Sequence, residues 1–358
     1  MPELKTPEIS KRAQRALARA AHDRHAQLVG GLVAGTGAAI AATKAALDRR
    51  AADGAKPGEE RTYRLRRKEP AAAGIRRVAE GRADDALERL REGADGDPAP
   101  TVHEARKDLK KLRSVLRLVR DDLGEAVYRS ENVRFRDAGR MLSGARDAQV
   151  KLETLAALRE RFGERLPPDG MALFAHALEG ERERLADPDG EVLALDRAAG
   201  AIEAGRNGIA EWPLHADEWS LVGPGLKRSY RRGRGRYADL RDGAGDEAVH
   251  EWRKRVKDLW YQLRLVRNTK KSVLGEAADE AHELSDLLGD HHDLAILRDD
   301  AIKRRELFAD GDLEKLLTSI SERQEELAAD ALALGERVYA EKPKAFERRI
   351  RSYWKSWR

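Results

Sequence analysis

Two stretches of the sequence carry the same row of basic side chains behind a histidine. Residues 102–120 read VHEARKDLKKLRSVLRLVR and residues 249–267 read VHEWRKRVKDLWYQLRLVR, with 12 identities among 19 aligned positions. Because the shared basic residues are spaced by three, four or seven positions, each copy should present them on one face of a helix. The row comprises His103, Arg106, Lys107, Lys110 and Arg117 in the first copy and His250, Arg253, Lys254, Lys257 and Arg264 in the second.

Such rows are electrostatically unfavourable without a counter-charge. The first copy contains seven cations against Glu104 and Asp108, and the second contains six against Glu251 and Asp258. Like charges at i, i+4 destabilise a helix by roughly a few tenths of a kcal/mol per pair, so the pattern indicates that an anion binds there. Phosphate suits this lining, because guanidinium groups bind its oxygens bidentately, lysine adds a point charge, and neutral imidazole donates one N–H.

The segments around the two rows add charge of the same sign. Residues 225–236 read GLKRSYRRGRGR, with six cations and no acid, and two arginines occupy the matching place in the first half. If both halves turn these faces toward each other, they form a channel or groove lined by arginine and lysine. The predicted lining therefore adds to the two rows Arg76, Arg77, Lys227, Arg228, Arg140 and Arg146.

The elements that must hold these rows are helices. Ala, Leu, Arg and Glu recur at i, i+3, i+4 spacing without a convincing alternating strand, which predicts an all-α fold. The apolar stripes behind the rows comprise Leu109, Leu112, Leu116 and Val119, and then Val256, Leu259, Leu263 and Val266. Breaks rich in Gly or Pro predict helices at 70–91, 102–122, 127–162, 170–186, 191–210, 219–240, 247–268, 274–308, 312–340 and 343–357.

The repeat extends beyond the rows. Residues 74–92 match 225–243 upstream, and residues 141–155 match 286–300 downstream. Three elements in the same order indicate that about 150 residues were duplicated. We therefore predict a domain at 61–358 made of two pseudo-symmetric antiparallel four-helix bundles, at about 63–212 and 213–358. Residues 1–60 are predicted to form an Ala-rich basic helical extension and a linker.

Composition restricts the classes of function. The 358-residue chain is 37% charged but has a net charge of only +5, so local clustering must select the partner. The lack of cysteine excludes disulfides, thiolate catalysis and cysteine-based metal sites, and the 5% aromatic content weakens models in which bases stack on aromatic platforms. No stretch is apolar over the roughly 20 residues of a membrane span, so we expect a soluble cytoplasmic protein.

The doubled motif resembles the CHAD domain, the conserved-histidine α-helical domain. The likeness rests on two HxxRxxxK helices, on LSGARD (142–147) and LGDHHD (288–293) after them, and on YRLRRKEP (63–70), and it covers roughly residues 63–358. The resemblance implies paired bundles around a basic cavity that binds inorganic polyphosphate without catalysis, metal or cofactor, on polyphosphate granules. By motif position, it maps the lining to His103, Arg106, Lys110, Arg113, His250, Arg253 and Lys257. Trp260 departs from the pattern, because Arg113 stands at its place in the first copy.

Three other functions stay open from the sequence, one of which is a protein-interaction scaffold that uses the bundle surfaces. A nucleic-acid-binding helical protein would use the same cations, although the low aromatic content and the lack of a recognised motif argue against it. A metal-dependent phosphohydrolase would use His291 and Asp293 in GDHHDL. Against this, the first-half counterpart GARDAQ has no histidine, and His291 and His292 diverge by about 100° on a helix.

Residues near the rows also receive individual interpretations. Asp147 and Asp293 are expected to form ion pairs that steady a lining arginine, and Gly144 and Gly289 to permit close helix packing. Solvated faces are expected for Lys111, Arg120, Arg255 and Arg267. The closing stretch RRIRSYWKSWR (348–358) fits either a closing helix or an extra contact with a polyanion. With histidines set among cations, polyphosphate should bind more tightly as the pH falls through about 6.5.

Overall fold

The elements that carry the basic rows are helices. A computed structural model describes residues 63–94, 98–142, 144–185, 188–242 and 245–358, so the predicted extension at 1–60 lies outside the described residues. Within those ranges every regular element is helical, which confirms the predicted all-α fold. The α-helices are α3 (Ala71–Ala94), α4 (Pro98–Leu118), α5 (Arg120–Leu123), α6 (Glu125–Met141), α7 (Gly144–Phe162), α8 (Pro168–Leu185), α9 (Pro188–Gly208), α10 (Glu218–Arg241), α11 (Asp246–Val266), α12 (Lys271–Lys303), α13 (Asp312–Val338) and α14 (Pro343–Trp357). None of the described helices is long and apolar enough to cross a membrane.

Both predicted apolar stripes are buried. In α4, Leu109, Leu112 and Leu116 are at most 2% exposed, and Val256 and Leu259 of α11 are at most 1% exposed. Burying a leucine or valine side chain contributes about 1.5–3 kcal/mol, so each stripe strongly fixes which face of its helix meets the core. The basic rows then follow on the flanking faces of the same two helices.

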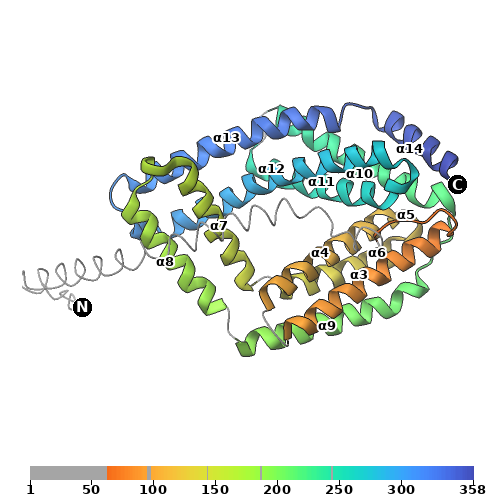
Figure 1. Ribbon diagram of the computed structural model, residues 1–358, viewed down its shortest axis with the longest axis horizontal. Coiled ribbons are helices and arrows are strands. Elements are labelled where there is room, and N and C mark those ends of the chain that lie inside the picture. Colours follow the sequence, from red (N-terminus) through yellow and green to blue (C-terminus); the bar gives the residue numbers. More distant parts are fainter. Residues whose placement is uncertain (1–62, 95–97, 143, 186–187, 243–244) are drawn as a thin grey trace, which may run out of the picture. The chain divides into compact units, whose positions relative to one another are not determined.

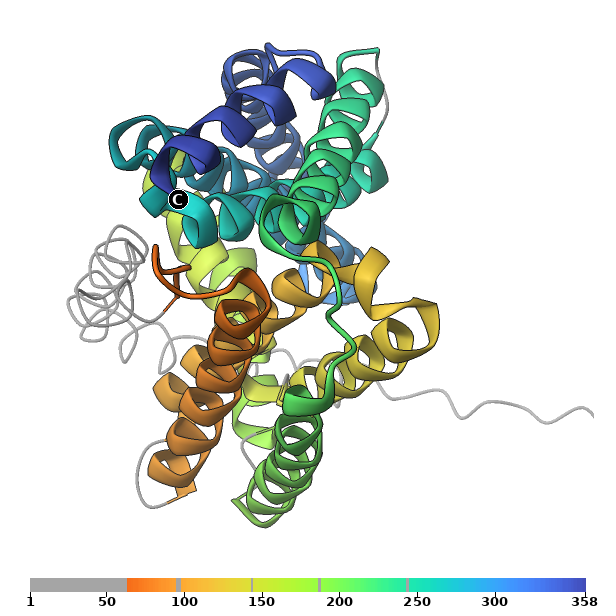
Figure 2. The same ribbon diagram turned by 90° about the vertical axis from the view of Figure 1, so that its right-hand side faces the viewer.

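The helices assemble into two groups. An N-terminal group contains α3, α4, α6 and α9, and a C-terminal group contains α10 to α14 (Figure 1). Figure 2 shows the same arrangement from the end, with the C-terminal group above the N-terminal one. Direct contacts of α4 with α10 and α11 join the groups, and the described residues belong to one compact unit. The origin of both groups in a duplicated four-helix bundle stays a prediction.

The helix predicted at 127–162 is two helices. α6 ends at Met141 and α7 begins at Gly144, whereas α12 runs without a break from Lys271 to Lys303. Serine and glycine have low helix propensity, and the sequence places Ser143 and Gly144 together at this point. The aligned positions in α12 are Leu288 and Gly289, so the longer apolar side chain accompanies the unbroken helix.

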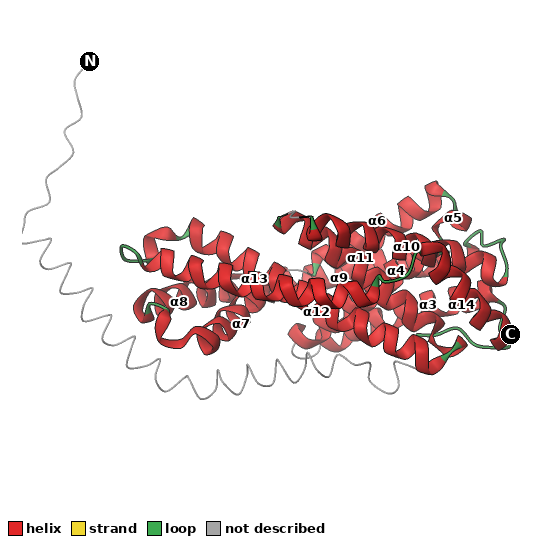
Figure 3. Ribbon diagram, turned by 90° about the horizontal axis from the view of Figure 1, so that it is seen from above, coloured by secondary structure: helices red, strands yellow, loops and turns green. Residues whose placement is uncertain are grey.

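α7 and α8 form a hairpin that packs on the far ends of α12 and α13 (Figure 3). This region has a small core of its own, which includes Phe174, Leu297 and Ile320. Lys151 of α7 lies 2.7 Å from Glu181 of α8 and 3.0 Å from Asp300 of α12. The hairpin is thus anchored to the C-terminal group although it belongs to the first half of the chain.

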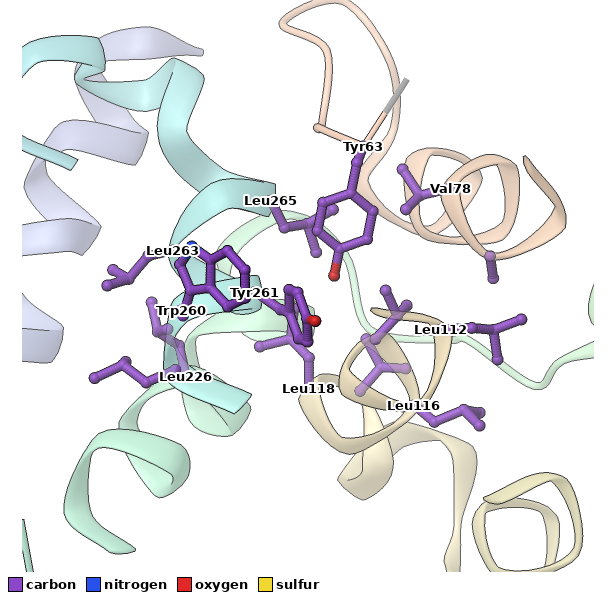
Figure 4. Packing of buried hydrophobic residues seen from close by; sticks show 14 of the residues in the cluster. Tyr63, Val78, Leu112, Leu116, Leu118, Leu226, Trp260, Tyr261, Leu263 and Leu265 are labelled. Atoms are coloured by element: carbon purple, nitrogen blue, oxygen red, sulfur yellow. The ribbon is translucent and has the colours of Figure 1, made fainter. Parts of the chain in front are cut away.

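The two groups meet at the lead-in segment, defined as residues 63–70. Tyr63 lies between α3 and α11, and its ring centroid is 6.4 Å from that of Tyr261 (Figure 4). The Leu65 backbone N–H donates to the Leu265 carbonyl oxygen at 3.0 Å. On α10, a Cβ at Gly225 would lie only 1.7 Å from the Leu118 carbonyl oxygen, so glycine is required where α10 crosses α4.

Candidate functional site

α4 and α11 bring the two basic rows within electrostatic reach of each other. The pKa of Lys257 lies well below its ordinary value, first because of the charge of Arg253, and then because of burial and the charge of Lys110 on α4. Asp286 and Asp293 of α12 act in the opposite direction without restoring the usual pKa. Lys110 and Lys257 occupy the same position of the repeat, so the rows approach each other there.

The crossing of α4 and α11 is held by polar contacts. The Ser114 hydroxyl donates to the Asp258 carbonyl oxygen at 3.2 Å, and the Gln262 side-chain amide donates to the Ser114 carbonyl oxygen at 3.3 Å. Arg117 adds an ion pair with the Asp258 carboxylate at 2.9 Å. Because Ser114, Gln262 and Asp258 are buried, these bonds are shielded from water and fix the orientation of the rows.

Two imidazoles stack at one end of the α11 row. The rings of His250 on α11 and His292 on α12 have centroids 4.1 Å apart and planes inclined by 31°. Burial, followed by the charges of His250 and Arg253, lowers the pKa of His292 to about 4. Burial and then the charge of Lys254 also lower the pKa of His250. In the unliganded protein, therefore, the titration expected near pH 6.5 falls at lower pH for this pair.

Arg253 lies beside the stacked histidines. Its Nε atom is buried and has no hydrogen-bond partner among the described residues. The guanidinium group lies against Gly289 of α12, where a Cβ would come within 3.4 Å of Nε, in line with the close packing predicted for this glycine. Its neighbour Lys254 instead pairs with Glu251 at 2.5 Å. Arg253 is therefore a strong candidate for binding an external anion.

The start of the α4 row is partly paired with local groups. Arg106 lies 3.4 Å from the Asp147 carboxylate and donates to the Leu142 carbonyl oxygen at 3.3 Å. This contact confirms the ion pair predicted for Asp147, whereas the place of Arg106 in a lining and the ion pair of Asp293 stay predictions. Lys107 pairs with Glu104 at 3.2 Å, at the same repeat positions as the Lys–Glu pair of α11.

Beyond the crossing, the α4 row leads into an arginine recess. This recess has a cavity volume of only about 10 Å³ and is lined by Arg117, Arg120, Tyr128, Arg228, Ser229, Arg232, Arg255 and Asp258. The lining thus holds five arginines and one carboxylate, and Arg120 and Arg228 pair with Glu125 and Asp121 next to it. Sequence reasoning missed Arg232 and assigned Arg120 and Arg255 to solvated faces, because their place depends on how α10 crosses the end of α4. The available signal was the presence of six cations and no acid in residues 225–236.

Arg113 lies near this recess. Burial, followed by the charge of Arg117, lowers the pKa of Arg113 to about 10. Its Nε donates to the Asn132 side-chain oxygen at 3.1 Å, which is a neutral partner. Burial and the charge of Arg255 likewise lower the pKa of Arg232. A bound polyanion would offset the part of this lowering that comes from repulsion between the arginines.

Arg264 lies in the core instead of the recess. Its side chain is buried, with the guanidinium carbon 5.8 Å from the Tyr63 ring centroid and 5.5 Å from that of Trp260. Trp260 also lies edge-on to His282, at 4.0 Å. The α11 row therefore changes from cations to an aromatic cluster at Trp260, the position where the sequence departs from the first copy.

Other predicted lining residues join helices to loops or lie on the surface. Their partners are the Trp212 carbonyl oxygen for Arg76, Glu69 for Arg77, Asp121 for Arg228 and Asp137 for Arg140. Lys227 is half-buried on α10, and the side chain of Arg146 lies outside the described residues. Of these six, the structure brings only Arg228 to the arginine recess among the side chains it describes.

Lys111 is buried, so its predicted place on a solvated face is wrong. It is 1% exposed and lies 3.6 Å from Asp108, which is also 1% exposed. Arg82 and Arg89 of α3 complete the cluster, at 2.8 and 2.9 Å from the same carboxylate. The buried Asp108 carboxylate on the same helix is the counter-charge that allows this lysine to enter the interior, and Arg82 and Arg89 share that carboxylate.

The GDHHDL segment separates its two histidines. His292 stacks on His250, whereas His291 is buried and lies 3.4 Å from the Gln324 side-chain nitrogen on α13. The predicted divergence of the two rings is confirmed. Across the described ranges, no group of three or more His, Cys, Asp and Glu side chains is arranged to hold a metal ion.

The family model described as "CHAD domain" matches residues 83–301. The match contains both basic rows, the stacked histidines and the arginine recess, and it covers more than half of the chain. The protein therefore belongs to the CHAD domain family, as its doubled HxxRxxxK motif predicted. No curated protein matches the sequence.

Proposed function

We propose that the protein binds inorganic polyphosphate, without cleaving it, along the basic rows of α4 and α11. The observation that carries the proposal is the hydrogen-bonded crossing of α4 and α11, which brings the two basic rows together. There the charge of Arg253, burial and the charge of Lys110 lower the pKa of Lys257. A chain of phosphates would neutralise these charges from within the crossing. Membership of the CHAD family, which is linked to polyphosphate, supports the choice of ligand.

Both ends of the crossing supply further phosphate ligands. On one side, Arg253 and the neutral imidazoles of His250 and His292 offer N–H donors. On the other, Arg113 and Arg232 add guanidinium groups near the arginine recess. Donors spread over this length suit a linear polyanion better than a single phosphate. We further propose that the bound chain brings the protein to cytoplasmic polyphosphate granules, which fluorescence co-localisation with stained granules would test.

Calorimetric titration with polyphosphates of defined length tests the proposal. Arg106→Glu combined with Arg253→Glu should strongly weaken binding of long polyphosphate, because it reverses one cation in each row. Lys303→Glu combined with Arg305→Glu changes the net charge equally, at exposed positions at and just after the end of α12 that belong to neither row. This control variant should bind like the wild type. Affinity of the wild type should also fall with salt, by about 0.7 in log K per log unit for each phosphate neutralised, by analogy with single strands. Undiminished binding by a folded Arg106/Arg253 variant would refute the assignment.

Two of the alternative functions have their own tests. RNA that displaced polyphosphate at equal phosphate concentration would favour a nucleic-acid-binding protein. Phosphate release that required Mg²⁺ or Mn²⁺ and disappeared in Asp293→Ala would favour a phosphohydrolase. We expect neither result, because the candidate site offers cations and neutral donors that bind phosphate oxygens.

A further inference from the structure

A second cluster of cations surrounds a cleft far from the basic rows in the sequence. The cleft, of about 580 Å³, is lined by the lead-in segment, the start of α10 and the last turns of α14. Its cations include Arg67, Lys68, Arg351 and Lys355, all of which lie outside the residues matched by the family model. It shares no lining residue with the arginine recess.

The carboxylates of this cleft already have partners. Glu69 accepts from Arg77 at 2.6 Å, and Glu218 pairs with Arg358 at 2.7 Å. The Asp217 carboxylate caps α10 by accepting from the Glu218 backbone N–H at 2.7 Å. The negative charges are thus committed to contacts that hold the cleft together, and their capacity to pair with the lining cations is reduced.

The cations are not committed in the same way. Within the part of the chain that the structure describes, Arg67, Lys68, Arg351 and Lys355 form no side-chain hydrogen bond or ion pair with a protein group. All four are exposed. Four unpaired cations around one concave surface create a positive potential that a small polyanion can neutralise.

The walls of the cleft are held in place independently of any ligand. Arg358 donates to the carbonyl oxygens of Arg67 and Glu69 at 2.7 and 2.6 Å, so the end of the chain clamps the lead-in segment. Trp354 donates from its indole N–H to Glu218 at 3.1 Å, and Trp219 donates to Glu347 at 2.7 Å. A pre-formed site of this size falls in the range of ligand pockets, about 300–1,000 Å³.

We infer that this cleft is a second anion-binding site, for a short chain of phosphates such as a triphosphate group. Trp219 and Trp354 are buried, so their rings are not available for a nucleobase to stack on. The triphosphate group alone is therefore the recognised feature, whether it comes from inorganic tripolyphosphate or from a nucleotide. This inference does not depend on the proposed function of α4 and α11.

Titration of the full chain with inorganic tripolyphosphate, and separately with ATP, tests this assignment. Lys68→Glu combined with Lys355→Glu should weaken binding at one site at least tenfold, on the order of the loss of a charged hydrogen bond. The matched control is Lys342→Glu combined with Lys344→Glu, which reverses two exposed lysines at the other end of α14 and should change nothing. The Arg106→Glu and Arg253→Glu variant should keep the cleft site, whatever happens to binding on the rows.

Two results would overturn the inference. The first is a Lys68/Lys355 variant that titrates with tripolyphosphate as the wild type does. The second is ATP binding at the cleft more than about tenfold tighter than tripolyphosphate, since that would mean that the nucleoside supplies the recognition. If only the rows fail to bind, the proposed function is wrong and the cleft assignment stands. If only the cleft fails, the reverse holds.

Discussion

The two copies of the basic helix, α4 and α11, differ by an exchange of charge at their crossing. Asp108 and Lys111 of α4 correspond to Arg255 and Asp258 of α11, so acid and base swap places. Within each helix the exchanged pair still interacts, at 3.6 Å in α4 and 3.4 Å in α11. The swap therefore leaves the local i, i+3 pair intact and changes only which partners each carboxylate finds on other helices.

Those partners give the two carboxylates different roles. Asp108 pairs with Arg82 and Arg89 of α3 and thus stabilises its own helix group. Asp258 pairs with Arg117 of α4 and joins the two groups beside the arginine recess. Most residues that are identical in the two copies belong to the basic rows or to the core. The positions where acid and base are exchanged make different contacts in the two copies, so the junction between α4 and α11 is asymmetric.

Replacing Asp108 and Asp258 one at a time should give the largest change in the free energy of unfolding. Asp108→Asn should lower the free energy of unfolding by about 3–5 kcal/mol, because it removes the buried carboxylate that Arg82, Arg89 and Lys111 share. Asp258→Asn should lower it by only about 1–2 kcal/mol, since the Arg117 side chain is 21% exposed and can be hydrated. Urea denaturation followed by circular dichroism measures both. Equal losses would show that the two carboxylates do not differ in role.

The same exchange explains what the sequence could and could not predict. Helices and apolar stripes follow from periodicity, and the stripe of α4 was identified residue by residue. The burial of Lys111 was not predicted, because the spacing to Asp108 does not show that this carboxylate is buried against α3, and the repeat replaces Asp108 by Arg255. Arg264 was assigned to the groove by equivalence with Arg117. Arg117 pairs with Asp258, but the residue at the position of Asp258 in the first copy is Lys111, which has the same charge as Arg264. Arg264 therefore packs on aromatic rings instead.

The candidate site was predicted in part for the same reason. Spacing placed His250, Arg253 and Lys257 on one face, which the contacts of α11 with α12 confirm for the first two. The stacking of His292 on His250 required knowledge of how α12 packs against α11. The repeat itself carries a hint, because the alignment of residues 141–155 with 286–300 places Asp147 opposite His292, so only the second copy has a histidine at this position.

That difference should make the stability of the free protein depend on pH through the second copy. The pKa of His292 is about 4 in the folded protein, against about 6.5 when unfolded, so the unfolded state binds the proton first. This contribution is complete above pH 6.5 and is lost as the pH falls toward 4. At pH 5 the loss should be roughly 1–2 kcal/mol, measured by urea denaturation at pH 7 and 5.

His292→Gln should reduce this pH dependence, and the exposed His215→Gln should retain it. Saturating polyphosphate should reverse the trend, because a polyanion beside His250 and His292 raises their pKa values and is bound more tightly at pH 5 than at pH 7. Calorimetry in buffers of different ionisation enthalpy would detect the protons taken up on binding. If the pH dependence of stability were unchanged in His292→Gln, the titration of His292 would not be its cause.

The smallest changes in affinity and stability should come from substitutions at the position where the rows diverge. This position is Arg113 in α4 and Trp260 in α11. Arg113→Gln should weaken polyphosphate binding about fivefold, on the order of 1 kcal/mol, because it removes one guanidinium group and leaves the neutral contact to Asn132 available. Trp260→Phe should leave affinity unchanged and lower stability slightly, since its ring packs against Tyr261 and His282. Titration of both variants with one chain length decides the matter. Equal weakening would mean that the aromatic cluster of α11 contacts the ligand, and that both rows extend over the same length.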